Sequence, residues 1–179
     1  MMDDRMVKLI GERIFSDPQL NVYAVLDGAS AHGLLQKLFP SGAKYFCVLP
    51  GDLEPDMAEV APYLVQLRPD SDLARWVLTE GWGKHWGIFA ASPADPRTMR
   101  GHFRGLVKVY DEEGKPLIFR YYDPRVLREF LTTCTSDELQ EMFGPIAAYY
   151  AEAEDPAILL SFSRRGEELA KQEIKLTGK

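Results

Sequence analysis

Apolar and polar positions follow two different periods along this chain, and short segments of each kind alternate from residue 22 onward. Apolar runs typical of buried strands are separated from amphipathic runs by Gly or Pro. The predicted strands are 22–27, 44–49, 63–67 and 87–91. The predicted helices between them are 30–39, 55–60 and 71–78, the last capped by Ser71 or Asp72. This alternation predicts an α/β fold, with a mixed sheet and flanking helices.

Two Asp-Pro pairs, at 95–96 and 123–124, indicate helix starts in the second half of the chain. The Asp side chain accepts hydrogen bonds from free N–H groups of the first turn, and Pro fits the first helical position. The predicted helices run from Asp95 to about Leu106, from Asp123 to Thr133, and from Ser136 to a stop at Gly144-Pro145.

Two β-hairpins are expected in the same half, over 107–110 with 117–120 and over 146–150 with 157–162. The loop of the first hairpin contains Gly114, which can take the positive φ that a longer turn needs. The second strand of that hairpin is expected to continue to Tyr122 and run straight into the helix capped by Asp123.

The chain turns polar from Arg164. The segment 167–175 has little apolar surface and fits either a solvated helix, supported by Glu167 and Lys171 at i,i+4, or a frayed tail. With 179 residues the chain suits one core. We therefore expect an α/β domain over 1–145, with 146–179 as a short C-terminal extension, a hairpin plus a polar tail, packed on it.

Composition narrows the classes of function. A net charge of −6 disfavours binding to phosphate backbones, so nucleic acid is not expected as a partner. No run of roughly eighteen apolar residues suggests a membrane span, and the first residues lack the apolar stretch of a signal peptide. We expect a cytoplasmic protein without a membrane partner. Cys47 and Cys134 fit small buried hydrophobes better than a disulfide.

One segment resembles a catalytic motif. Residues 28–33, Gly-Ala-Ser-Ala-His-Gly, lie between a strand and a helix, as a hydrolase nucleophile elbow does, but His32 replaces the second Gly of that pattern. Ser30 is more simply explained as a helix cap. The alternative function is a small serine hydrolase that uses Ser30 with His85 or His102 as its base. We expect no catalytic residue, no cofactor and no metal, because the histidines lack metal-ligand spacing.

Two other features suggest surfaces for a partner. Arg97, Arg100 and Arg104 recur at helical spacing, next to an apolar side that includes Phe103. This pattern fits either an ordinary solvated amphipathic helix or a cationic face for an acidic partner segment. The tryptophans fit either core packing or the lining of a groove, and they are Trp76, Trp82 and Trp86.

The run Arg-Tyr-Tyr-Asp-Pro-Arg-Val-Leu at 120–127 resembles the signature of the domain of unknown function 4123 family, whose members act as effector chaperones, or adaptors, of bacterial type VI secretion. Further blocks that resemble the family stand in the same order at 23–29, 61–65, Trp82, 104–109 and 143–145. Together these blocks extend over roughly residues 20 to 145, most of the chain.

The resemblance implies a non-catalytic, cytoplasmic adaptor that binds a secreted effector protein and helps to load it onto the valine-glycine repeat spike protein. Arg120 and Arg125 match a family block, with a strand-face ion pair and a first-turn Arg as their structural alternatives. The residues expected to contact a partner are Arg97, Arg100, Phe103, Arg104, Arg120 and Arg125.

Overall fold

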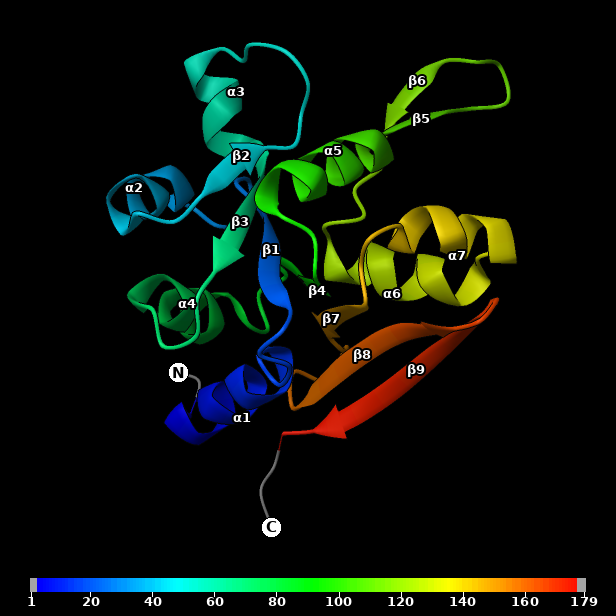
Figure 1. Cartoon of the computed structure of the whole chain (residues 1–179). Coiled ribbons are helices and arrows are strands. Elements are labelled where there is room, and N and C mark those ends of the chain that lie inside the picture. Colours follow the sequence, from blue (N-terminus) through cyan, green and yellow to red (C-terminus); the bar gives the residue numbers. More distant parts are fainter. Residues whose placement is uncertain (1–2, 177–179) are drawn as a thin grey trace.

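Seven strands form one sheet in the order β2-β3-β1-β4-β7-β8-β9, and every neighbouring pair is antiparallel (Figure 1). The computed structural model describes residues 3–176. The strands are β1 Asn21–Asp27, β2 Tyr45–Cys47, β3 Pro62–Leu67, β4 Gly87–Ser92, β7 Ala148–Glu152, β8 Ile158–Arg165 and β9 Glu168–Lys175. A separate hairpin consists of β5 Lys108–Tyr110 and β6 Pro116–Ile118. The predicted α/β class, with flanking helices and hairpins in the second half, is confirmed. The sheet, which was expected to be mixed, is antiparallel throughout.

Helices cover both faces of this sheet. They are α1 Asp4–Ile14, α2 Leu34–Leu38, α3 Pro55–Val60, α4 Asp72–Trp76, α5 Pro96–Val107, α6 Pro124–Thr133 and α7 Ser136–Phe143, with short turns η1 Phe39–Ser41 and η2 Val77–Gly81. Apolar residues of α5, α6 and α7 pack into one cluster, and those of α1, α2, α4 and η2 pack into another. The sheet therefore has a hydrophobic core on each side.

Strand β1 takes part in both cores. Tyr23 and Val25 belong to the cluster with α5 to α7, whereas Ala24 and Leu26 belong to the other cluster. Successive side chains of a strand point to opposite faces, so a strand covered on both sides needs apolar residues at every position. This explains why β1 appears in the sequence as a continuous apolar run.

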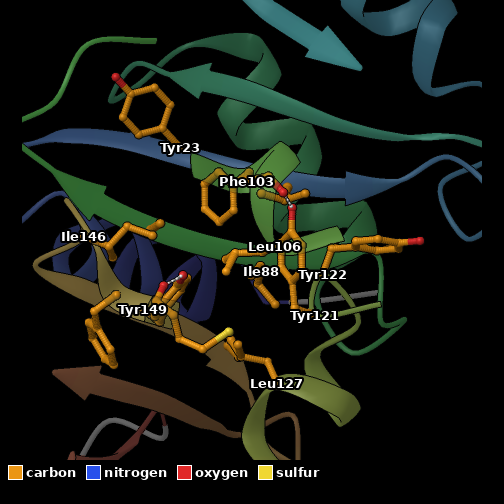
Figure 2. Packing of buried hydrophobic residues seen from close by; sticks show 14 of the residues in the cluster. Tyr23, Ile88, Phe103, Leu106, Tyr121, Tyr122, Leu127, Ile146 and Tyr149 are labelled. Carbon is orange, nitrogen blue, oxygen red and sulfur yellow. Dashed lines mark hydrogen bonds between the residues drawn. The ribbon is translucent and has the colours of Figure 1, made fainter. Parts of the chain in front are cut away.

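Buried tyrosines join the elements of the first core (Figure 2). Tyr121 stacks on Phe103 with ring centroids 5.5 Å apart, and its hydroxyl donates to the Phe103 carbonyl at 2.9 Å. The Tyr149 hydroxyl donates to the Met142 carbonyl at 2.6 Å. Because a buried hydroxyl without a partner is costly, these bonds fix how α5, the segment before α6, α7 and β7 lie together.

The predicted caps of the longer helices are confirmed. Asp95 accepts a hydrogen bond from Thr98 N at 2.8 Å, and Asp123 accepts one from Arg125 N at 2.9 Å. Ser71 caps α4 in the same way. The two Asp-Pro pairs therefore mark helix starts, as the residue preferences predict.

Two predictions near helix starts are wrong. Ser30 does not cap its helix, because α2 begins only at Leu34, with Gly33 at the cap position in a left-handed conformation (φ 77°). The strand expected to reach Tyr122 ends at Ile118, because Tyr121 and Tyr122 turn into the core before α6 begins. Their burial outweighs the β preference of this aromatic segment.

The segment predicted as a solvated helix or frayed tail is strand β9. It pairs with β8 along its whole length, from Ile158↔Lys175 to Arg165↔Glu168. Strands β7, β8 and β9 therefore continue the same sheet as residues 21–92. The N-terminal helix α1 was not predicted; its signals are Asp3, which caps it, and Ile10 and Ile14, which are buried one turn apart.

Asp123→Ala is expected to lower the free energy of unfolding by about 0.5–2 kcal/mol at neutral pH, because it removes the cap of α6. Urea unfolding checks this, with Asp52→Ala at an exposed loop position as the control. An unchanged midpoint for Asp123→Ala would contradict the importance of the cap.

The effect should also depend on pH. Burial alone raises the pKa of Asp123, but hydrogen bonds from the Arg125 side chain and backbone outweigh it and hold the pKa below its usual value. A lowered pKa stabilises the fold above the unfolded-state value of about 4 and loses that effect as pH falls through the folded-state value. The difference between the wild type and Asp123→Ala should therefore shrink with acidification in that range.

Candidate interaction surface

The hairpin β5–β6 projects from the body of the protein beyond the end of α5 (Figure 1). Its side chains include large apolar groups with substantial exposed fractions: Tyr110 61%, Ile118 58%, Leu117 46% and Val109 37%. An isolated two-stranded hairpin is only marginally stable, and a concentration of exposed apolar side chains marks an interaction site. The hairpin is therefore the first candidate for contact with a partner.

Both faces of the hairpin are apolar. Val109 lies directly opposite Leu117, so these two side chains share one face. Tyr110 and Ile118 lie on the other face together with Lys108, whose ammonium is 5.7 Å from the centroid of the Tyr110 ring. A hairpin that packs one face on the protein normally carries polar side chains on its other face, which meets water. In β5–β6 both faces carry exposed apolar side chains.

A groove of about 350 Å³ adjoins the base of the hairpin, between α5, α6 and α7. Its apolar lining is Leu106, Val109, Phe119, Phe130 and Met142. The rings of Phe119 and Phe130 pack edge to face with centroids 4.7 Å apart. Because Val109 belongs to both the hairpin and the groove, the two form one continuous apolar surface. We call the exposed side chains of β5 and β6 together with this groove the hairpin surface.

Carboxylates border the hairpin surface. Glu138 and Glu141 lie at the groove, and the hairpin loop contributes Asp111, Glu112 and Glu113. Asp111 also shapes the loop, since its side chain accepts hydrogen bonds from Glu113 N at 3.0 Å and Lys115 N at 2.8 Å. The cations in this region are Lys108 and Lys115. The border is therefore mainly acidic and favours a partner with basic groups.

The cationic side of α5 is largely engaged within the protein. The Arg104 guanidinium donates to the carbonyls of Cys47 at 3.2 Å and Leu49 at 3.3 Å, and so ties the end of β2 and the chain after it to α5. The Arg100 guanidinium lies 5.2 Å from the centroid of the Phe46 ring. Arg97 is exposed. Of the three cations predicted to face a partner, Arg97 is the one with the most open position.

Phe103, also predicted as a partner contact, lies fully inside the core with an exposed fraction of 0%. It stacks on Tyr121 and contacts Tyr149 edge to face. A partner cannot reach it in this fold, so that prediction is wrong. Helical spacing placed Phe103 correctly on the apolar side of α5, but that side faces the sheet.

Arg120 is bonded to a buried carboxylate at the end of β1. Its Nη2 lies 2.9 Å from Oδ2 of Asp27, whose exposed fraction is 3%. Burial disfavours the charged guanidinium, but the attraction of Asp27 outweighs it and raises the pKa of Arg120. About half of the Arg120 side chain remains exposed. The ion pair predicted as a structural alternative is present, with a strand-end carboxylate as its partner.

Arg125 forms a two-point contact with Asp123. Its Nε lies 3.0 Å from Oδ1 and its Nη2 lies 2.7 Å from Oδ2. The same carboxylate caps α6, so one Asp side chain serves the helix and holds the Arg. The Arg125 side chain is 55% exposed, so part of it stays open to solvent.

Ser30 is part of the Asp27 cluster. Its hydroxyl donates to Asp27 Oδ2 at 3.0 Å. The His85 ring pairs with Glu152, and His102 Nε2 lies 3.0 Å from the Met142 carbonyl oxygen. Within residues 3–176, neither histidine proposed as a base is hydrogen-bonded to Ser30. The arrangement expected of a nucleophile and its base is thus not formed by these groups.

All three tryptophans pack in the core cluster that includes α1, α2 and α4, which fits the core-packing alternative. Trp82 is buried, stacks on Phe89 and donates from Nε1 to the Pro156 carbonyl at 2.7 Å. Trp76 and Trp86 are half-buried and lie 4.8 Å apart between centroids.

No set of three possible metal ligands gathers within the described part of the chain, and no helix there is long and apolar enough to span a bilayer.

Sequence reasoning located the hairpin but not its importance as a surface. The signal was available: 107–110 and 117–120 have no regular alternation of apolar and polar residues, although the segment between them is a short polar turn. A hairpin of this kind must be covered on both faces or meet a partner. The cationic spacing on α5 was the more conspicuous pattern.

The comparisons with known proteins gave one match. The model of a family described as a domain of unknown function (DUF4123) matches residues 22–141. No curated protein and no solved structure matches the chain. The matched range includes the hairpin, the Asp27 cluster and the whole of α5 and α6.

Arg120→Ala is expected to lower the free energy of unfolding by about 1–2 kcal/mol, because buried Asp27 loses its ionic hydrogen bond while the Arg side chain is only half shielded from water. Arg97→Ala, which removes an exposed Arg, is the matched control and should change stability by less than about 0.5 kcal/mol. Chemical unfolding of both variants measures the difference. Equal stability of the two variants would contradict the role of the Asp27 contact.

Proposed function

Because the chain belongs to the domain of unknown function 4123 family, which includes adaptors of type VI secretion effectors, we propose that it is a non-catalytic adaptor that uses its hairpin surface. It binds one secreted effector and assists the loading of that effector onto the valine-glycine repeat spike protein. The observation that carries this proposal is a projecting hairpin that is apolar on both faces and continuous with an apolar groove.

The apolar side chains supply the affinity. Fully burying a large apolar side chain is worth about 1.5–3 kcal/mol, and the exposed fractions of Tyr110 and Ile118 leave more than half of that gain for a partner. Binding energy usually concentrates in a few such anchors, and Tyr is among the most frequent. Tyr110 and Ile118 lie diagonally across the two strands on one face, so we assign them as the main anchors.

The charged border supplies the choice of partner. Carboxylates at the groove and at the hairpin loop favour an apolar segment flanked by Lys or Arg, and repel an acidic one. We therefore propose that the effector presents such a segment, which the groove holds next to Phe119 and Phe130. Covering an apolar segment of the effector before secretion is the work of a chaperone, and no bond needs to be made or broken.

The contacts of Ser30 support a non-catalytic role. A serine nucleophile needs a base that removes its proton and hydrogen-bond donors for the developing oxyanion. Here the Ser30 hydroxyl donates to Asp27, which is already neutralised by Arg120. Ser30 therefore serves the turn after β1, where it helps to hold a buried carboxylate.

Deleting the gene for this protein in its bacterium should remove one effector from the secreted fraction. The protein that forms the tube of the type VI secretion apparatus should still be exported. The effector is identified by comparing secreted fractions by mass spectrometry, and is then purified for direct binding. Loss of the tube protein as well, or an unchanged set of secreted effectors, would contradict an adaptor role.

Tyr110→Ser combined with Ile118→Ser should weaken binding of the purified effector about 100-fold or more, since two anchors are lost. Phe39→Ser is the matched control, because Phe39 in η1 is 85% exposed but lies outside the hairpin surface. Calorimetry measures both affinities, and thermal melting checks that the variants stay folded.

Unchanged affinity of the folded hairpin variant would place the interface elsewhere. In that case Arg97→Glu combined with Arg100→Glu tests the cationic end of α5, the surface that the sequence pattern favours. Loss of binding in that variant, with full binding in the hairpin variant, would replace the hairpin surface by α5 in the proposal.

Glu112→Lys combined with Glu141→Lys should slow association with the effector by about tenfold at low salt and leave dissociation nearly unchanged, because border charges mainly steer encounter. The difference from wild type should decrease as salt rises. Stopped-flow kinetics at several salt concentrations provides the measurement. Faster association after these reversals would show that the effector segment is acidic.

A further inference from the structure

Strand β9 ends the sheet and offers a long free edge. Its inner edge pairs with β8 over all eight residues, and in the described part of the chain no strand pairs with its outer edge (Figure 1). The strand at the other end of the sheet, β2, has only three residues. A long unpaired edge presents a row of backbone N–H and C=O groups that another strand can bind.

The side chains of β9 alternate in charge along one face. Leu169, Lys171, Glu173 and Lys175 point to the same side of the sheet, and the Lys171 Nζ lies 3.5 Å from Glu173 Oε1. Ala170 and Ile174 point to the opposite side and are partly buried. Lysines on an edge normally discourage pairing with a second strand. Here Glu173 lies next to Lys171, so a strand that places a Glu opposite Lys171 and a Lys opposite Glu173 can still pair with β9.

A second copy of the chain can add its own β9 in antiparallel fashion, related by a two-fold axis perpendicular to the sheet. Such an axis keeps each side chain on its own face, so it must pass midway between the two copies of one residue, which then lies opposite itself. Registers centred on Lys171 or on Gln172 keep nearly the whole strand paired. They differ in the charges that they bring together.

Centring on Lys171 places two lysines opposite each other, which is unfavourable. Centring on Gln172 places Lys171 opposite Glu173 of the partner subunit, and by symmetry this contact forms twice. It also places Ala170 opposite Ile174 of the partner subunit, a small side chain against a large one. The charge pattern of β9 is therefore complementary to itself in one register.

We propose that the protein forms a two-fold dimer in which β9 pairs with β9 of a second copy, centred on Gln172, so that the two sheets become one. The four charges of Lys171 and Glu173 then alternate around the axis. The proposal rests on β9 alone and does not depend on the adaptor assignment. The hairpin β5–β6 stands apart from this edge, with α7 between them (Figure 1).

Sedimentation velocity of the purified protein between about 1 and 100 µM tests the dimer. The wild type should change from the 20.3 kDa monomer to twice that mass as concentration rises. Lys171→Glu places Glu opposite Glu and should weaken the dimer about tenfold or more. Adding Glu173→Lys to that variant reverses both charges and should restore the dimer.

Lys8→Glu is the control for losing an exposed pair within one chain, since Lys8 lies 3.9 Å from Glu12 on α1. It should leave the dimer intact. Thermal melting shows whether each variant is folded. A wild type that stays monomeric at 100 µM would overturn the proposal, and so would a dimer that ignores the single charge reversal.

A disulfide tests the register. Residues that face each other across antiparallel strands have Cα atoms about 4.5–5.5 Å apart, within reach of a disulfide. Gln172→Cys should therefore form a dimer linked between the two introduced cysteines on mild oxidation, as identified by peptide mass spectrometry. Lys175→Cys, which faces Leu169 of the partner subunit, should not link to itself. The opposite result would overturn the Gln172-centred pairing.

Discussion

The bond between Arg120 and buried Asp27 determines where the hairpin surface stands. Asp27 ends the inner strand β1, and Arg120 lies two residues after β6 in the chain. Directly beyond Arg120, Tyr121 enters the core and Asp123 caps α6. The returning strand of the hairpin is thus attached to the sheet by charge, packing and a helix start within a few residues. An apolar hairpin without this anchoring would be free to collapse onto the body of the protein.

A buried carboxylate lowers the stability of a fold unless hydrogen bonds and an opposite charge compensate for its loss of water. Asp27 meets this condition through three donors, the Arg120 guanidinium, the Ser30 hydroxyl and the Ala29 N–H. Residues that resemble a catalytic motif in the sequence thereby form a structural cluster, and the requirement explains why a Ser stands at this turn. The same logic applies at Asp123, where one carboxylate binds Arg125 and starts a helix.

Local signals were sufficient for most of the fold. The Asp-Pro pairs, the apolar runs of β1 to β4 and the two hairpins were predicted because residue preference and periodicity agree there with the tertiary structure. Strand β9 was not, because its polar residues carry little strand preference and its conformation comes from pairing with β8. Arg104 shows the same limit for the site: its bonds reach carbonyls in the last residue of β2 and just beyond it, which no spacing on α5 reveals. Whether a charged side chain is free depends on neighbours that are distant in sequence.

The hairpin leaves the core after Val107 and returns near Phe119, where the Phe119 N–H donates to the Val107 carbonyl at 2.7 Å. That bond closes the base of the excursion, and everything beyond it contacts mainly solvent. Lengthening such a loop adds little entropy cost, since closure depends only weakly on length. The hairpin between Val107 and Phe119 can therefore change in sequence and length without repacking of the two cores of the sheet.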